Sequence, residues 1–311
     1  MPNKAPFPIQ AELTAVAIAY KNKDMIADRV APRVPVGTEE FKYMKHTMEE
    51  GFTVPDTKVG RKSKPNEVSF SGTEVTDSTE DFGLDDPIPQ KDIDQAPANY
   101  DPKAKSVEYI SNLVELDREI RVAGLVFNAA NYSVGYKQTL AGVTQFSDFA
   151  SSDPIGVIMD ALDAMIMRAN VMTIGRRPLS ILSRHPDIVK ATHGNSGDKG
   201  IAQRQAIAEL FELEEILVGA SFVNNARKGQ PVSMARVWGN HIALINRDMN
   251  ADTRNGLSFA MTAQFGNRVA GSHPDPDIGL RGGERVRAGE SVKELLTAPD
   301  LGYFIQDAVA P

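Results

Sequence analysis

A long polar stretch, residues 41–97, constrains this chain more than any other feature of its sequence. Phe41 and Tyr43 alternate with charged residues near its start, and Val68 and Phe70 alternate with polar residues further on. Such alternation predicts two β-strands, and the segment between them is rich in Pro, Asp, Lys and Gly. The stretch has too few large apolar residues to build its own core. We therefore expect a long β-hairpin whose tip depends on contacts made outside its own fold.

The charges of this expected hairpin are segregated along the chain. Four basic residues lie near the tip of the hairpin: Lys58, Arg61, Lys62 and Lys64. Six acidic residues lie on the segment that leads out of the hairpin: Glu74, Asp77, Glu80, Asp81, Asp85 and Asp86. A solvated face accounts for most charge runs of this kind. The alternative is that the basic tip of one copy contacts the acidic strip of a neighbouring copy. These ten residues are therefore the candidate inter-subunit contacts.

A long amphipathic helix follows the hairpin. Asp101 is placed to cap it, and Pro102 suits its first turn. From Lys103 to Asn131 it would extend about 43 Å at ~1.5 Å per residue. The expected apolar stripe is Tyr109, Leu113, Leu116, Ile120, Ala123, Phe127 and Ala130, and the opposite side carries Asn112, Glu115, Arg118, Glu119 and Arg121. Asp117 and Arg121 are spaced for an ion pair. A coiled coil is the alternative, but one run with Ala at two stripe positions favours packing on a sheet.

The rest of the chain mixes short helices and strands. Before the hairpin, a proline-punctuated arm holds one possible helix, Glu12–Ala27. After the long helix, we expect helices near 154–169, 186–193 and 201–215; strands at 179–182, 216–223 and 257–265; a hairpin across 232–245; and two final strands, 291–297 and 303–309, around a turn at Pro299 and Asp300. Irregular mixing of this kind predicts an α+β fold.

Composition narrows the function classes. The 311 residues are 41% hydrophobic and 24% charged, with a formal charge of -7 and no cysteine. The negative charge argues against a nucleic-acid reader, which normally has a clustered basic face. The lack of cysteine excludes disulfides, thiolate metal sites and cysteine nucleophiles. We expect neither a signal peptide nor a membrane-spanning helix.

The sequence contains no recognisable catalytic pattern. The glycine-rich segment 194–200 lacks the Ser or Thr that follows the Lys of a phosphate loop. The segment 219–223 lacks the second glycine of a nucleophile elbow. His185 and His193 fall at opposite ends of one expected helix, too far apart to share a metal, and His273 lies in a proline-stiffened turn. We therefore expect no catalytic, cofactor-binding or metal-binding residue.

The order of these parts resembles the major capsid proteins of tailed bacteriophages, a fold shared with encapsulin shells. The resemblance covers nearly the whole chain. It is carried by residues 17–22 with 26–36, by Phe41-Lys42-Tyr43, by Gly51-Phe52-Thr53-Val54-Pro55-Asp56-Thr57-Lys58-Val59-Gly60-Arg61, and by Asp81-Phe82-Gly83-Leu84-Asp85-Asp86-Pro87-Ile88-Pro89. These stretches are similar to one subfamily of such proteins, whose wider fold shares little sequence.

The resemblance implies an icosahedral shell of pentamers and hexamers that encloses double-stranded DNA, located in the virion and assembled in the host cytoplasm. The implied domains are an arm at 1–40, an extended loop at 41–97, a peripheral domain with the spine helix at 98–149 and 286–311, and an axial domain at 150–285. Because the arm begins almost at Met1, scaffold and any protease are expected to be separate proteins, besides a portal and decoration proteins. A negative subunit would contact packaged DNA only non-specifically.

Two other functions remain open from the sequence. A bacterial nanocompartment shell of the same fold would enclose a protein cargo rather than DNA. An enzyme with a long active-site lid would fold residues 41–97 over a polar cleft of the same chain.

Overall fold

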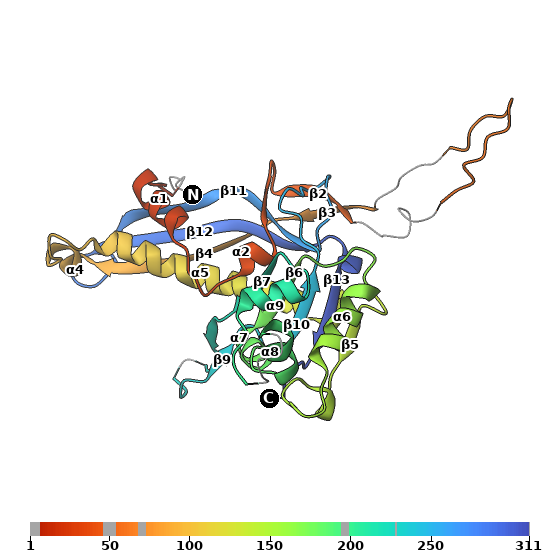
Figure 1. The fold of residues 1–311 in the computed structure, drawn as a ribbon. Helices are drawn as coiled ribbons and strands as arrows, with labels where there is room; N and C mark the ends of the chain where they lie inside the picture. Colours follow the sequence, from red (N-terminus) through yellow and green to blue (C-terminus); the bar gives the residue numbers. More distant parts are fainter. Residues whose placement is uncertain (1–6, 46–53, 68–72, 194–198, 228, 311) are drawn as a thin grey trace.

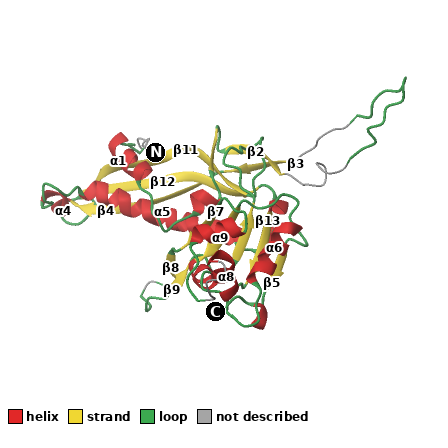
Figure 2. Ribbon diagram, in the orientation of Figure 1, coloured by secondary structure: helices red, strands yellow, loops and turns green. Residues whose placement is uncertain are grey.

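The computed structural model describes residues 7–45, 54–67, 73–193, 199–227 and 229–310. Figure 1 shows an elongated upper part, in which strands run beside a long helix, a compact lower part, and a hairpin that projects away from both. Figure 2 shows that helices pack against strands in both parts. The upper part holds the arm and the long helix, so it positions most of the residues considered below.

The upper sheet has the strand order β1-β11-β12-β4. Its strands are β1 (Arg33–Val36), β11 (Ala260–Asp275), β12 (Gly283–Leu296) and β4 (Glu80–Pro89). β11 and β12 form a long antiparallel hairpin, β4 pairs antiparallel with β12, and β1 pairs parallel with β11. The sheet thus combines β4 from the end of the polar stretch, β1 from the arm, and β11 and β12 from the late part of the chain.

The long helix is α5 (Pro102–Val126), followed by a short 3-10 turn, Ala129–Asn131. The Asp101 side chain accepts a hydrogen bond from the backbone N–H of Lys103 at 2.9 Å, as a capping residue should. The start is therefore confirmed, whereas the expected end at Asn131 was too late because the chain leaves the helix at Phe127.

The expected buried stripe of α5 was wrong over its first half. Tyr109 is 62% exposed and Ile120 is 39% exposed. The face that packs on the sheet carries Val107, Ile110 and Val114 instead. These three residues also repeat at helical spacing, so periodicity alone does not decide which stripe meets the sheet.

The arm forms two short helices rather than one. They are α1 (Ala11–Ala19) and α2 (Ala27–Val30). Leu13 and Ala17 of α1 pack in one apolar cluster with the buried face of α5 and with β11 and β12. The backbone N–H of Gln10 donates to the carbonyl of Ala270 at 3.0 Å, which fastens the start of α1 to β11.

The lower sheet has the order β5-β13-β10-β6-β7. Its strands are β5 (Lys137–Thr139), β13 (Gly302–Gln306), β10 (Ile242–Ile245), β6 (Val171–Gly175) and β7 (Glu215–Gly219), and the helices of this part are α6 (Pro154–Ala164), α7 (Arg176–Leu182), α8 (Pro186–His193) and α9 (Arg204–Leu210). Every residue of β6 and β10 is buried, so this sheet is the centre of the larger apolar core.

Three expectations for this part were wrong. Residues 179–182 belong to helix α7, because a short apolar run does not distinguish a buried strand from a buried helix. The helix expected at 201–215 is shorter, because α9 spans only Arg204–Leu210. The hairpin expected across 232–245 does not form: β9 (Met234–Arg236) pairs with β8 (Phe222–Asn224), while β10 pairs with β6 and β13.

The polar stretch forms the expected hairpin at its base. β2 (Glu40–Lys45) pairs antiparallel with β3 (Thr73–Ser78), and β4 and the short helix α4 (Gln90–Asp94) follow. The strand positions expected at Val68 and Phe70 lie outside the described residues.

Strand pairing crosses one of the expected domain boundaries. Residue 285 lies within β12, which pairs along its length with β11, so the expected boundary at 285/286 falls inside one hairpin. The two final strands do not pair with each other: β12 lies in the upper sheet, and β13 in the lower sheet with β5.

Candidate functional site

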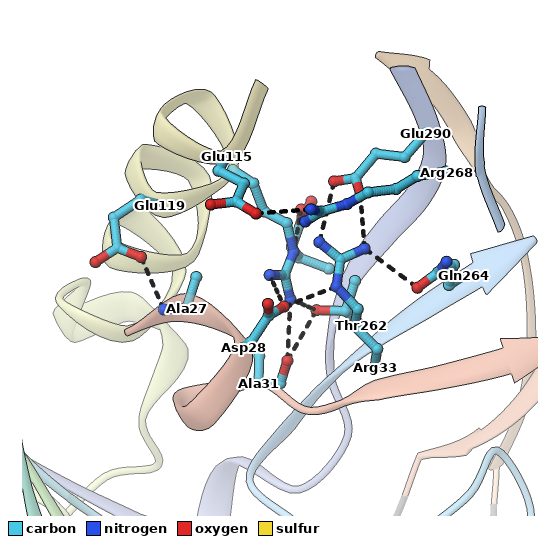
Figure 3. A network of polar contacts seen from close by, with 12 residues as sticks. Ala27, Asp28, Ala31, Arg33, Glu115, Glu119, Thr262, Gln264, Arg268 and Glu290 are labelled. Carbon is cyan, nitrogen blue, oxygen red and sulfur yellow. Dashed lines mark hydrogen bonds and ion pairs between the residues drawn. The ribbon is translucent and has the colours of Figure 1, made fainter. Parts of the chain in front are cut away.

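A network of charged side chains fixes the arm to the upper sheet (Figure 3). The Arg33 guanidinium contacts both oxygens of Glu290, at 2.7 and 3.2 Å, and contacts Asp28 at 2.7 Å. Arg268 of β11 reaches the same Glu290 at 3.0 Å and Glu115 of α5 at 2.7 Å. The Glu290 side chain is fully buried, and burial alone raises a carboxyl pKa. Arg33 and Arg268 outweigh this effect and hold the pKa of Glu290 below its usual value.

Arg118 of α5 is the most buried cation of the network, at 2% exposed. It forms an ion pair with Asp28, and it donates to the carbonyl of Ala31 at 3.1 Å and to the Thr262 hydroxyl at 2.8 Å. Burial raises the pKa of Asp28, but Arg118 and Arg33 together hold it below its ordinary range. Arg118 therefore ties the spine helix, the arm and β11 at one point.

Glu119, the next residue along α5, also binds the arm. Its carboxylate accepts the backbone N–H of Ile26 at 3.0 Å and of Ala27 at 2.7 Å, and the indole N–H of Trp238 at 2.5 Å. Burial raises the pKa of Glu119 above its ordinary value, although these donors favour the charged form. The sequence placed Arg118 and Glu119 on the side of α5 opposite the expected apolar stripe. The structure buries both side chains there, because partners 87 or more residues away in the chain cover them.

The four basic candidates lie in the projecting hairpin. Lys58, Arg61, Lys62 and Lys64 are all exposed. Contacts here are local: the Lys58 N–H donates to Asp56 at 2.9 Å, and Lys64 pairs with Glu67. The described part of the hairpin tip, residues 54–67, projects away from the body of its own chain (Figure 1), whereas a lid would lie over it.

Most of the acidic candidates have partners in their own chain. Glu74 pairs with Lys42, Glu80 pairs with Lys293 at 2.6 Å, Asp85 holds Arg287 through two bonds of 2.6 and 2.8 Å, Asp86 accepts from Ser106 at 2.6 Å, and Asp77 lies 4.0 Å from Lys293. Asp81 is exposed and has no ion pair among the residues that the structure describes. The structure brings Glu80, Asp81, Asp85 and Asp86 together on β4, at the edge of the upper sheet.

One arrangement looks like a catalytic triad and is not one. The Ser152 hydroxyl lies 3.1 Å from His185 Nε2, and Asp187 lies 3.6 Å from His185 Nδ1. However, Nδ1 accepts the backbone N–H of Asp187 at 3.3 Å, so Nε2 carries the proton and donates to Ser152. Ser152 in turn donates to the carbonyl of Asp148 at 2.6 Å. A base that removes a serine proton needs a free Nε2, so this group of residues is structural.

No group of three or more His, Asp or Glu side chains is placed to hold a metal ion within the described ranges. Nor does any helix there combine the length and apolarity needed to cross a membrane. A pocket of about 430 Å³ beside the arm is lined by Arg118, Glu119 and Asp28, which the network already engages.

Comparisons with solved structures define the class of fold. The capsid of cyanophage P-SCSP1u aligns with a TM-score of 0.57 at 10% identity, over 98% of this chain and 92% of that one. An encapsulin complex from Synechococcus elongatus aligns with a TM-score of 0.52 at 9% identity, over 99% and 92%. A phage-related protein from Bordetella bronchiseptica aligns with a TM-score of 0.77 at 22% identity, over 99% and 100%. The fold is therefore that of phage capsid and encapsulin shell proteins, which confirms the expected α+β capsid fold.

Sequence comparison identifies the family within this class. No family model matches the chain. The major capsid protein of Pseudomonas phage JBD67 is 58% identical over 308 residues, 99% of each chain. The major capsid protein of Burkholderia phage BcepMu is 27% identical over 300 residues, 94% of each chain. This chain belongs to the phage major capsid proteins and is a component of the virion.

Proposed function

We propose that the chain is the repeating subunit of an icosahedral phage head, in which pentamers and hexamers enclose double-stranded DNA. The observation that carries this proposal is the hairpin tip, residues 54–67, all of which are exposed and make only local contacts. Such a segment cannot build its own core, and in this proposal other copies supply its contacts. Contacts of this kind, repeated around closed rings, build a shell.

Sedimentation of the purified protein, alone and with a scaffolding protein of the same phage, tests the proposal. Capsomers or megadalton particles are the expected species. A protein that stays monomeric at high concentration in both conditions would contradict the proposed assembly.

The candidate contacts retain a role in this proposal with one refinement. The four basic residues of the tip would approach the acidic strip of a neighbouring copy, centred on Asp81. Glu80 and Asp85 already neutralise Lys293 and Arg287, so a second cation would complete a network there instead of forming an isolated pair. Isolated exposed pairs contribute only ~0–1 kcal/mol, and networks contribute more.

The division into an arm (1–40), an extended loop (41–97), a peripheral domain and an axial domain is part of the same proposal. The sheet pairings support two changes to the ranges. β11 and β12 both belong with the spine helix in the peripheral domain, and β5 and β13 belong with the axial sheet. β12 and β13, the two final strands, then lie in different domains and connect them.

Scaffold, maturation protease, portal and decoration proteins are the further partners proposed. Packaged DNA would be contacted without sequence preference, since the formal charge of -7 disfavours tight phosphate binding. We infer a structural rather than an enzymatic role.

A nanocompartment shell is the second candidate, supported by the encapsulin fold similarity. The contents of purified particles separate the two functions. Nuclease-protected DNA is expected for a phage head, and a protein cargo without DNA for a nanocompartment.

A further inference from the structure

The helices of the lower part carry a local excess of positive charge. Residues 176–204 contain six Arg or Lys and two Asp, whereas the whole chain contains 34 Lys or Arg and 41 Asp or Glu. The stretch covers α7 and α8 and reaches the start of α9, and Figure 1 shows these three helices together in the lower part. A basic stretch within an acidic chain indicates a surface for a negatively charged partner.

Two contacts bring cations from separate segments of this stretch together. The backbone N–H of Ala202 donates to the carbonyl of Ser183 at 2.8 Å. A Cβ at Gly200 would lie 3.5 Å from the Val189 side chain. Residues 199–204 therefore run beside residues 183–190. Four exposed cations lie on these two segments, and we call them the basic face: Arg184, Lys190, Lys199 and Arg204.

The charge of the basic face is not neutralised by its own chain. None of the four cations forms an ion pair with a residue that the structure describes. Arg184 donates to the carbonyl of Ser180 at 2.8 Å, a contact that orients the guanidinium and leaves its charge in place. Asp187, the acidic residue of α8, lies 3.6 Å from His185. In the arm network, by contrast, Arg33 and Arg268 each contact carboxylates.

This combination of groups suits a phosphate backbone. Exposed cations bind DNA phosphates because condensed counterions are released from the DNA. Gln203, which is exposed between Lys199 and Arg204, adds a side-chain amide of the kind that donates to phosphate and sugar oxygens. Four cations give weak, salt-sensitive binding without sequence preference, which is compatible with the negative charge of the whole chain.

We propose that the basic face binds the phosphate backbone of the double-stranded DNA enclosed by the shell. This inference rests on the proposed function and names the surface through which the subunit contacts that DNA. It also orients the subunit, because α8 and α9 must then face the interior of the particle.

Photocrosslinking of filled, nuclease-treated particles tests what lies on the basic face. Ile201 is 67% exposed and lies between Lys199 and Arg204 in the chain. We expect a photoreactive diazirine side chain in place of Ile201 to attach the subunit to DNA on illumination, and particles emptied of DNA should give no such product. Attachment only to protein would assign the face to a protein partner and overturn the proposal. Wild-type particles without nuclease-protected DNA would instead refute the proposed function.

A second test changes the charge of the face in the purified full-length subunit. The triple variant Lys190→Gln, Lys199→Gln and Arg204→Gln changes only exposed side chains, so its melting temperature should match that of the wild type. Its affinity for a duplex DNA at low salt should fall roughly tenfold or more, and the slope of log affinity against log salt should become shallower by about three.

The matched control removes the same charge from exposed lysines of the upper part, through Lys21→Gln, Lys91→Gln and Lys105→Gln. This control should keep the wild-type salt slope. Equal losses in the two triple variants would show that net charge and not the basic face determines DNA binding, which would overturn the proposal.

Discussion

The indole N–H of Trp238 donates to the carboxylate of Glu119 at 2.5 Å, and this bond links the lower part of the molecule to the spine helix. The same carboxylate accepts the backbone N–H groups of Ile26 and Ala27. Arm, spine helix and lower part therefore meet at one buried acceptor, and the relative position of all three depends on it.

Glu119→Ala should destabilise the subunit by about 2–4 kcal/mol, because it leaves three buried donors without an acceptor. Urea unfolding of the monomer measures the loss. Glu108→Ala is the control, since Glu108 forms only a surface pair with Lys105, and its effect should stay within ~0.5 kcal/mol. Equal effects of the two variants would show that the Glu119 contacts contribute no more than a surface pair.

Two glycines should respond in opposite directions to alanine. A Cβ at Gly219 would lie 2.0 Å from the Trp238 ring, whereas a Cβ at Gly124 of α5 meets nothing within 4 Å. We expect Gly219→Ala to destabilise the fold by about 2 kcal/mol or more through overpacking. Gly124→Ala should stabilise it by about 0.5–1 kcal/mol, as in an exposed helix interior. Thermal melts of both variants measure the difference, and a stabilised Gly219→Ala protein would contradict the packing described for Trp238.

Burial lowers the pKa of His185 below 6.5, although Asp187 and Asp153 act in the opposite direction. Between that lowered pKa and 6.5, the unfolded chain binds more protons at this residue than the folded chain. The contribution to stability is therefore fully present above pH 6.5 and is lost as the pH falls below it. His185→Gln should flatten the dependence of urea stability on pH between 5 and 7. A slope identical to that of the wild type would assign the effect to other groups, such as His241, whose pKa burial also lowers.

Reversing Lys58, Arg61, Lys62 and Lys64 to Glu should impair assembly more at low salt than at high salt, because exposed charges are screened over about 8–10 Å at physiological ionic strength. Light scattering across a salt series measures this. Monomer stability should not change, since these residues make only local contacts. Assembly that is impaired equally at all salt concentrations would remove the electrostatic account.

Deleting residues 49–66 should leave a folded subunit that assembles poorly. Circular dichroism checks the fold, and sedimentation checks the assembly. Shells of normal stability from this variant would contradict the role of the hairpin as a clamp between copies.

Local signals in the sequence predicted the parts that depend on neighbouring residues. The Asp101 cap, the base of the hairpin at Phe41 and Tyr43, and the start of the helix expected at 154–169 are confirmed, although that helix, α6, ends at Ala164. Arg118 and Glu119 were misplaced because their burial depends on the arm, which the helix pattern does not contain. The stripe on α5 was assigned to the wrong side because two apolar stripes share that helix.

The ten candidate contact residues remain a prediction, since contacts between copies lie beyond a single chain. What the structure adds is their surroundings. The basic residues are exposed on a projecting hairpin, and several of the acidic ones already hold partners on the sheet edge. Sequence patterns show charge but not which charges are already neutralised.

Electron microscopy of purified particles tests the central claim most directly. We expect closed icosahedral shells built of pentamers and hexamers, in which the hairpin of each subunit contacts a neighbouring subunit. Particles whose subunits keep the hairpin free of every neighbour, or preparations that contain only monomers, would contradict it.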